Sequence, residues 1–234
     1  MELKEINSLV ELFFKKFEQI TSEKFEKQEN TFLVSLKRTN KDGLYSSYSW
    51  GKTNNRIKIL STYLKNIISK GDNCILLSEN RPEWLISDIA IMNAGGVTVP
   101  LFTTYSENDY KYIFNDCEPK VCIVSNIEQF KKIENYIKDD TILISIDQFD
   151  KKVVCFNNIF EKSFDNDDID QTKNLYNKNI RRNDLACIIY TSGTTGNPKG
   201  VMLSHGGILS NCEGAREILD ILVKNEKPVF LTWL

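Results

Sequence analysis

The sequence predicts an α/β fold in which helices cover both faces of a parallel sheet. Short apolar runs alternate with longer segments whose apolar residues repeat at helical spacing, an order typical of βαβ units. The runs are apolar throughout rather than alternating, which predicts strands buried on both faces. The chain has 234 residues, of which 41% are hydrophobic and 26% charged. This composition indicates a globular protein that builds its own core.

The elements are expected in the following order along the chain. Apolar runs or alternation predict strands at 31–37, 74–77, 97–102, 121–124, 141–146, 185–190 and 229–234. Helical spacing predicts helices at 9–20, from Ser49 to Lys70, after Arg81, after Ser106, at 127–137 and from about 205 to 223.

Local signals support three of these helix starts. Ser49 can cap the second helix, and Pro82 stands at the first helical position of the third. Ser106 is followed three residues later by Asp109, which predicts a capping box.

The chain divides into three parts by composition. Residues 1–156 are expected to form a βαβ subdomain, 157–184 a polar surface connection with one or two short helices, and 185–234 a segment built around a glycine-rich loop. The last part ends inside the apolar run 229–234. Since an exposed apolar strand tends to aggregate, this ending predicts a truncated protein whose C-terminal remainder is absent.

Charge and composition exclude several classes of function. A net charge of −2 gives no basic field for a nucleic acid, and no stretch of 18 apolar residues predicts a transmembrane helix. Six cysteines without a CxxC pair are expected to be buried thiols in a reducing compartment, so we expect a cytoplasmic protein. His205 is the only histidine, which leaves almost no material for a zinc site or a histidine-based nucleophile.

The segment most informative about chemistry is 190–200, which reads Tyr-Thr-Ser-Gly-Thr-Thr-Gly-Asn-Pro-Lys-Gly. It follows a buried strand, and glycines there let the backbone turn sharply and approach a ligand. Hydroxyls and free backbone N–H groups form a concave set of donors for phosphate oxygens, and Lys199 adds a positive charge. The sequence therefore predicts a mobile phosphate-binding loop; the alternative is an idle surface turn.

The chain has no Walker A loop. Its only Gly-Lys-Thr, at 51–53, has serine at position 46, where that pattern needs glycine, and no strand directly before it.

Residues 191–202 resemble the phosphate-binding signature of the adenylate-forming superfamily, the AMP-dependent synthetases and ligases. Two further stretches resemble its long-chain fatty acid acyl-CoA synthetase branch. One runs from Gly71-Asp72 through Ser-Glu-Asn-Arg-Pro-Glu-Trp at 78–84 to Gly-Gly-Val-Thr-Val-Pro-Leu at 95–101, and the other is Phe-Leu-Thr-Trp-Leu at 230–234. The resemblance runs from about residue 30 to the end, and it implies the N-terminal part of the adenylate-forming (ANL) fold.

The resemblance implies a set of phosphate-binding residues and a two-step reaction. The residues implied to bind the β- and γ-phosphates of ATP are Thr191, Ser192, Gly193, Thr194, Thr195, Gly196 and Lys199. A fatty carboxylate attacks the α-phosphorus to give acyl-adenylate and pyrophosphate, with Mg²⁺ sharing the charge, and the CoA thiol then displaces AMP. By resemblance Trp233 approaches the acyl site. Peripheral contact with a membrane that supplies the fatty acid is compatible with this reaction.

The resemblance also implies that much of the machinery lies downstream of residue 234. The adenine and ribose motifs, the magnesium-binding glutamate, the hinge and the catalytic lysine are among these parts. We therefore expect no synthetase activity from the isolated chain. Two alternatives remain: a fatty acyl-AMP ligase, and a non-catalytic truncated or split protein that binds nucleotide.

Three other features are expected to be structural. His205, near the start of a helix, is interpreted as a neutral capping or packing residue, and Trp84 as a core residue. The acidic residues at 165–170 lack the glycine and terminal glutamate of a calcium loop, which favours a solvated turn.

Overall fold

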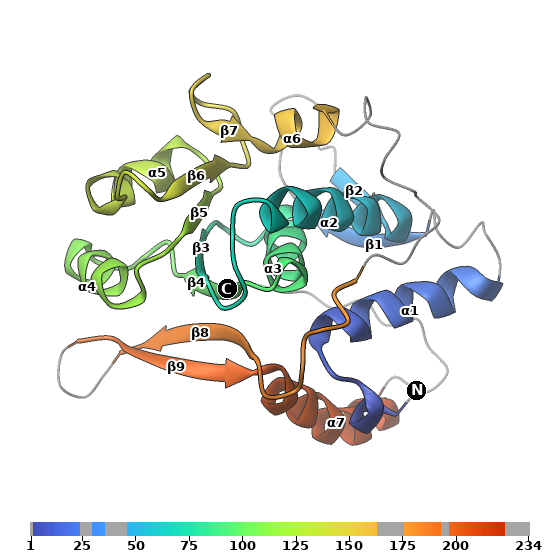
Figure 1. The fold of residues 1–234 in the computed structure, drawn as a ribbon. Helices are drawn as coiled ribbons and strands as arrows, with labels where there is room; N and C mark the ends of the chain where they lie inside the picture. The colour runs from blue at the N-terminus through green and yellow to red at the C-terminus, as the bar shows by residue number, and fades with distance from the viewer. Residues whose placement is uncertain (1, 24–29, 36–45, 163–175, 193–196, 223–234) are drawn as a thin grey trace.

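A computed structural model describes residues 2–23, 30–35, 46–162, 176–192 and 197–222 of the chain. Within these residues it confirms the α/β class, with a seven-stranded sheet and a separate two-stranded hairpin (Figure 1). In spatial order the large sheet contains β7 (Val154–Cys155), β6 (Ile142–Ser145), β5 (Val121–Val124), β3 (Asn73–Leu77), β4 (Val97–Leu101), β8 (Leu185–Thr191) and β9 (Lys199–Ser204). Strands from before residue 157 and after residue 184 thus share one sheet.

The sheet is mixed rather than wholly parallel. All pairs are parallel except β8 with β9, whose ladder runs from Leu185 opposite Ser204 to Thr191 opposite Lys199. The sequence prediction missed β9 and placed a turn and then a helix there. β9 lies at the sheet edge with most of its residues exposed, so it has no buried apolar run to reveal it.

The helices begin largely where the sequence signals place them. They are α1 (Leu9–Glu23), α2 (Trp50–Lys65), α3 (Pro82–Ala94), α4 (Glu107–Cys117), α5 (Ile127–Ile133), α6 (Phe156–Lys162) and α7 (His205–Leu222), with short 3-10 turns η1 (Leu3–Glu5) and η3 (Glu134–Tyr136). Ser49 accepts a hydrogen bond from Lys52 N, and Ser106 and Asp109 form the predicted capping box. Pro82 opens α3 as expected.

Helices cover the two faces of the sheet with separate hydrophobic cores. One core joins α1, α2, α3 and α6 to side chains such as Leu76 and Ile123, and the other joins α4 and α5 to Leu77 and Val124. Figure 1 shows α4 and α5 on one side of the strands and α2 and α3 on the other. Neighbouring strand residues alternate between the cores, as the pleat requires.

A small two-stranded sheet lies apart from the large one. β1 (Thr31–Ser35) pairs with β2 (Ser46–Ser49) beside α2, so the strand predicted at 31–37 is present as far as the described residues extend.

Four cysteines are buried, Cys187 is half-buried, and Cys212 on α7 is exposed, so the expectation of a buried thiol is wrong for Cys212. Within the described part of the chain, no helix is long and apolar enough to cross a membrane.

The connections after β3 and β4 leave the sheet in opposite directions. β3 leads to α3 on one face, and β4 leads to α4 on the other. Where neighbouring parallel strands diverge in this way, a crevice opens beyond their carboxyl ends, and ligands of α/β proteins bind in such crevices. The fold therefore directs the search for a site to the ends of β3 and β4 and to the adjacent β8.

Candidate functional site

The hairpin of β8 and β9 presents the predicted phosphate loop at its tip. Thr191 ends β8, and Lys199 begins β9 directly opposite it in the ladder. The side chains of Thr191, Ser192 and Lys199 are exposed. Four of the predicted residues, Gly193, Thr194, Thr195 and Gly196, lie outside the described residues, as do Trp233, the predicted strand at 229–234 and the acidic residues at 165–170.

Strand geometry places Thr191 and Lys199 on one face of the sheet. Residues two apart in a strand point to the same face, so Thr191 shares a face with Ile189. Directly opposed residues in an antiparallel pair also share a face, which adds Lys199. The hydroxyl and the ammonium group therefore lie on the face to which Ile189 belongs.

An apolar pocket opens on that same face. It has a volume of about 270 Å³ and is lined by Ser78, Glu79, Asn80, Trp84, Pro100, Leu101, Phe102, Thr103, Thr104 and Ile189. These residues come from the turn after β3, the start of α3, the end of β4 with the residues that follow it, and the carboxyl-terminal part of β8. This is the crevice that the topology predicts. Two strand residues span about 7 Å, so Thr191 lies about that far from the pocket wall at Ile189.

Trp84, expected in the core, lies at the edge of a core and also reaches the pocket. Trp84 is half-buried, packs against the edge of one core and forms part of the pocket wall. An apolar pocket with a few polar groups at its rim suits an organic ligand of mixed polarity.

The opposite face of the hairpin is anchored by Tyr190. The Tyr190 hydroxyl donates a hydrogen bond to Asp116 Oδ2 in α4 (2.5 Å), and the Tyr190 carbonyl accepts one from the Tyr105 hydroxyl (2.6 Å). Burial and the bond to Asp116 raise the pKa of Tyr190 well above its usual value, so the phenol stays protonated. A Cβ at Gly200 would lie 2.9 Å from Ile188 and 3.2 Å from the Tyr190 ring, so glycine permits this close packing. These contacts fix Tyr190 and Gly200 at the base of the loop, beside the exposed Thr191 and Lys199.

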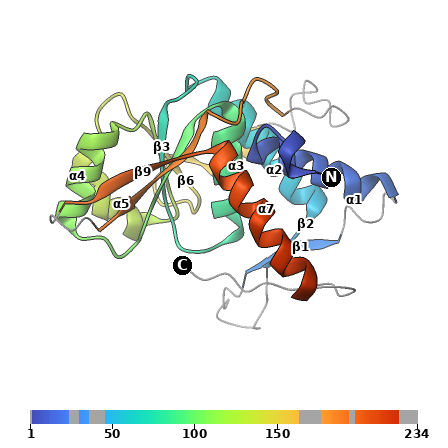
Figure 2. The ribbon, with the colours of Figure 1, turned by 90° about the horizontal axis from the view of Figure 1, so that it is seen from below.

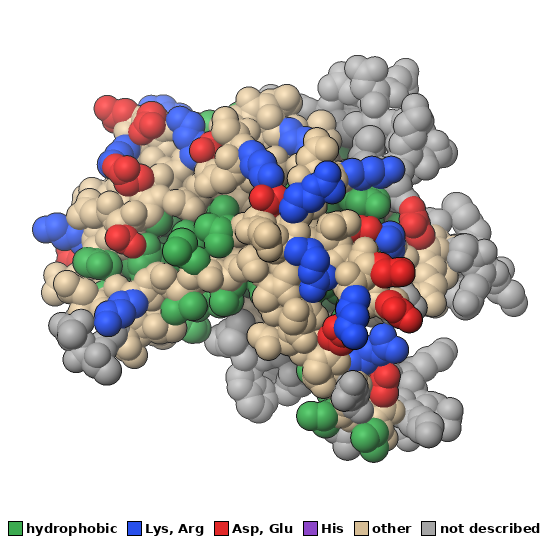
Figure 3. Space-filling model, turned by 60° about the horizontal axis from the view of Figure 1, so that its bottom comes forward, with side chains coloured by type: hydrophobic (Ala, Val, Ile, Leu, Met, Phe, Trp, Pro, Cys, Tyr) green, Lys and Arg blue, Asp and Glu red, His purple; other side chains and the backbone are tan. Residues whose placement is uncertain are grey.

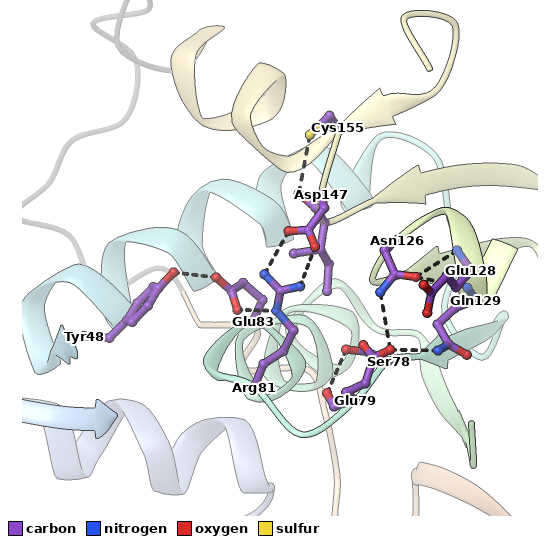
Figure 4. A network of polar contacts seen from close by, with 11 residues as sticks. Tyr48, Ser78, Glu79, Arg81, Glu83, Asn126, Glu128, Gln129, Asp147 and Cys155 are labelled. Atoms are coloured by element: carbon purple, nitrogen blue, oxygen red, sulfur yellow. Dashed lines mark hydrogen bonds and ion pairs between the residues drawn. The ribbon is translucent and has the colours of Figure 1, made fainter. Parts of the chain in front are cut away.

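The turn between β3 and α3 is held by a network of charged side chains, which Figure 4 shows. Arg81 donates through both terminal nitrogens to Asp147 (3.0 Å each) and through Nε to Glu83 (2.8 Å). Glu83 also accepts from the Tyr48 hydroxyl, which in turn accepts from Arg56. Residues of β2, α2, α3 and the segment after β6 are thus joined through Arg81 and Glu83.

The charged side chains of this network stay ionised at neutral pH. Burial alone would raise the pKa of the Glu83 carboxyl, but hydrogen bonds from Arg81 and Tyr48 outweigh it and the pKa is lowered. Burial and the bond to Glu83 raise the pKa of Tyr48 to about 12. Arg81 and Glu83 are part of the 78–84 motif, and the network gives both side chains a structural role.

His205 has the packing role expected from the sequence. Its side chain is 1% exposed, and burial lowers its pKa to about 4 despite the nearby Asp184 carboxylate. The ring is therefore neutral at pH 7, and Nδ1 accepts a hydrogen bond from the backbone N–H of Leu9 (3.3 Å).

The donor set of the site suits phosphate rather than a metal held by the protein alone. Among the described residues no group of three His, Cys, Asp or Glu could hold a metal ion. Hydroxyls and a lysine bind phosphate oxygens, and a Mg²⁺ ion that keeps most of its ligands from phosphates and water needs few protein groups.

The surface around the hairpin contains both charges and exposed apolar groups. On the face shown in Figure 3, basic and acidic side chains are interspersed, while hydrophobic side chains gather in a hollow between two parts of the molecule. Exposed apolar residues of β9 include Val201 and Met202. Apolar side chains are therefore exposed on the same strand as Lys199.

Sequence reasoning missed the residues that support the site. Asp116, Tyr105 and Asp147 contact Tyr190 or Arg81 across 66 to 85 positions of sequence. No local pattern marks such partners, because the sheet order alone brings them together.

Comparisons with known proteins agree with this architecture. Over 212 residues the chain is 29% identical to fatty acyl-CoA synthetase A of Dictyostelium discoideum, an alignment that covers 82% of this chain and 30% of the relative. It is 32% identical over 157 residues to long-chain-fatty-acid–CoA ligase 5 of Rattus norvegicus, covering 62% of this chain and 22% of the relative. The chain thus spans less than a third of the length of these curated relatives.

Solved structures share the fold at low sequence identity. A red-emitting luciferase of Phrixothrix hirtus superposes with a TM-score of 0.74 at 18% identity, over 90% of this chain and 38% of the luciferase. An anthranilate CoA ligase in complex with anthranoyl-AMP gives 0.66 at 19% identity, over 88% and 36% of the two chains. The fold is that of the N-terminal part of adenylate-forming enzymes. The family model described as AMP-binding enzyme matches residues 23–234, and the chain belongs to this family.

Proposed function

We propose that the chain supplies the phosphate-binding part of an enzyme that activates a long-chain fatty acid with ATP, first to acyl-adenylate and then to acyl-CoA. The observation that carries this proposal is the position of Thr191 and Lys199, exposed side by side on the sheet face that bears the apolar pocket. Family membership and the names of the matched relatives support the reaction class.

The proposed phosphate-binding residues are Thr191, Ser192, Gly193, Thr194, Thr195, Gly196 and Lys199. They would bind the β- and γ-phosphates of ATP, with Lys199 neutralising charge that grows on the leaving pyrophosphate. Mg²⁺ would arrive bound to the nucleotide and share that charge. The pocket beside Ile189 would receive an apolar part of an organic substrate, fatty acid or CoA, close to the reacting phosphate.

The complete reaction is proposed to need the part of the relatives that this chain does not span. The matched region covers 22% to 30% of the relatives cited above, so most of a full-length enzyme lies outside it. We propose that the isolated chain binds nucleotide without forming acyl-CoA. Because a fatty acid is the proposed substrate, a cytoplasmic location with peripheral membrane contact is proposed as well.

Calorimetric titration of the chain with inorganic tripolyphosphate and with MgATP tests the loop directly. Removing a charged hydrogen-bond donor costs about 1.5–3 kcal/mol, so Lys199→Ala should weaken affinity by about 10- to 100-fold. Lys151→Ala, at an exposed lysine beside β7 at the opposite sheet edge, is the control and should leave affinity unchanged. Equal affinities for the Lys199 variant and the wild type would rule out the assigned role.

Activity assays distinguish the rival functions. The chain incubated with ATP, fatty acid and CoA should release no pyrophosphate, and robust release would contradict its proposed dependence on the remaining part. In a full-length form, acyl-CoA formation supports the synthetase, whereas acyl-adenylate that does not react with CoA indicates a fatty acyl-AMP ligase. Nucleotide binding with neither product would indicate a non-catalytic protein.

A further inference from the structure

The base of the β8–β9 hairpin is fastened to the segment before it. His205 N donates a hydrogen bond to Asp184 O (3.0 Å), and Gly206 N donates one to Arg182 O (2.7 Å). A Cβ on residue 206 would lie 3.0 Å from Arg182 O, so only glycine allows this approach without displacement. The first turn of α7 is therefore fixed against residues 182–184.

An N-terminal arm, defined here as residues 3–12, packs on this junction. Arg182 Nη1 donates hydrogen bonds to the carbonyls of Leu3 (3.1 Å) and Ile6 (2.7 Å). Leu3 and Ile6 also form a small apolar cluster with Leu209 of α7. Figure 2 shows α1 and α7 side by side, away from α4 and α5. The arm thus contacts the helix that continues directly from the hairpin.

His205 joins the arm to the hairpin through one buried hydrogen bond. Leu9 begins α1, and its backbone N–H has no acceptor within its own helix. That N–H donates to Nδ1 of His205, which directly follows the last residue of β9. A histidine therefore serves as the cap of a helix 196 residues earlier in the sequence.

The arm lies outside the region that the family model matches, which begins at residue 23. We propose that the arm is a brace for the phosphate-loop hairpin and that His205 is the positioning residue through which it acts. This inference rests on the proposed phosphate-binding function. Ordering a glycine-rich loop around a ligand costs conformational entropy, and a loop whose base is already fixed loses less of it on binding.

Substitutions at two positions separate positioning from stability. His205→Leu removes the acceptor, whereas His205→Asn keeps an acceptor near the position of Nδ1. Arg182→Met keeps the aliphatic stem and removes both bonds to the arm. Ile57→Ala, in α2, is the stability control because Ile57 is fully buried and takes part in none of the hydrogen bonds that His205 and Arg182 make to the arm.

Two readouts report on the hairpin: the dissociation constant for inorganic tripolyphosphate, and the rate of trypsin cleavage after Lys199 in folded protein. His205→Leu should weaken binding and speed cleavage by about 10-fold, which is the free energy of one buried hydrogen bond expressed as a ratio of constants. Arg182→Met, which removes two hydrogen bonds to the arm, should change both by at least as much. His205→Asn and Ile57→Ala should stay within about twofold of wild type, since neither removes the tie.

The outcomes separate this proposal from the proposed function. If His205→Leu and Arg182→Met behave like Ile57→Ala in both readouts, the brace is wrong. If wild-type protein does not bind tripolyphosphate, the phosphate-binding function fails, and cleavage after Lys199 alone decides whether the arm positions the hairpin.

Discussion

Two turns border the same crevice, and they differ in whether their polar side chains have partners within the protein. In the β3–α3 turn, all three nitrogens of the Arg81 guanidinium donate to carboxylates, and the side chain is only 14% exposed. In the β8–β9 hairpin, the exposed side chains of Thr191, Ser192 and Lys199 have no hydrogen bond or ion pair within the part of the chain that the structure describes. The polar groups of the first turn bond to one another, whereas those of the second remain available to a ligand.

The difference separates scaffold from binding surface. Polar groups that are paired inside a protein stabilise one arrangement, and their bonding capacity is already used. Groups left facing solvent beside a pocket can bind a ligand, and a fixed base keeps the cost of ordering them low. Substitutions in the first turn should therefore change stability, and substitutions at the tip of the second should change ligand binding.

Arg81→Ala should have the largest effect on stability. It leaves the Glu83 and Asp147 carboxylates without their cation, and breaking such a partly buried pair costs about 4 kcal/mol in the free energy of unfolding. Urea denaturation measures the loss. Lys138→Ala, at an exposed ion pair with Glu118, is the control and should leave the midpoint unchanged. Tripolyphosphate affinity of the folded Arg81 variant should remain close to wild type, and a large loss there would contradict the division of roles.

Acid should weaken the base of the hairpin before it weakens the Arg81 network. The pKa of His205 is about 4 in the folded chain, below its usual 6.5, so the unfolded chain binds a proton first. Its contribution to stability is complete above pH 6.5 and is lost as pH falls towards 4, by about 3 kcal/mol at most. Comparing urea denaturation of wild type and His205→Asn from pH 7 to pH 4.5 isolates this contribution. Identical pH profiles would contradict the buried neutral ring.

Gly200→Ala should destabilise the hairpin by about 2 kcal/mol, the cost of overpacking a filled space. The added methyl group would approach Ile188 and the Tyr190 ring, and displacement of β9 should also weaken tripolyphosphate binding. Gly214→Ala in α7 is a matched control, since nothing lies within 4 Å of its new Cβ, and it should stabilise the helix by about 0.8 kcal/mol. Thermal unfolding distinguishes the two signs.

Tyr190→Phe should have the smallest effect, about 1 kcal/mol in unfolding free energy, because it removes one hydrogen bond to Asp116 and keeps the ring. Tyr112→Phe, at an exposed tyrosine on the same helix as Asp116, should change nothing measurable. If both variants unfold alike in urea, the anchor at Tyr190 contributes nothing.

Local signals predicted much of the fold. Ser106 with Asp109, and Pro82, mark helix starts through contacts within four residues, and the apolar runs mark central strands because both of their faces are buried. β9 was not predicted, because an edge strand with exposed side chains has no buried apolar run. The hydrogen bonds between Arg81 and Asp147 and between Leu9 and His205 could not be predicted from the sequence, because they depend on how the fold places distant segments.

The candidate site likewise contains features that local sequence indicates and features that depend on the fold. The proposal of a phosphate loop at 191–199 rests on glycines, hydroxyls and a lysine within nine residues of sequence. The pocket could not be predicted from the sequence, because Trp84, Pro100 and Ile189 come from a helix and two strands that only the fold brings together.

The most direct test of the phosphate-binding hairpin is backbone amide exchange of the chain with and without saturating inorganic tripolyphosphate. We expect slower exchange in residues 191–200, little change in the β3–α3 turn at 78–81, and loss of the effect in Lys199→Ala. Unchanged exchange at 191–200, or protection confined to another part of the chain, would contradict it.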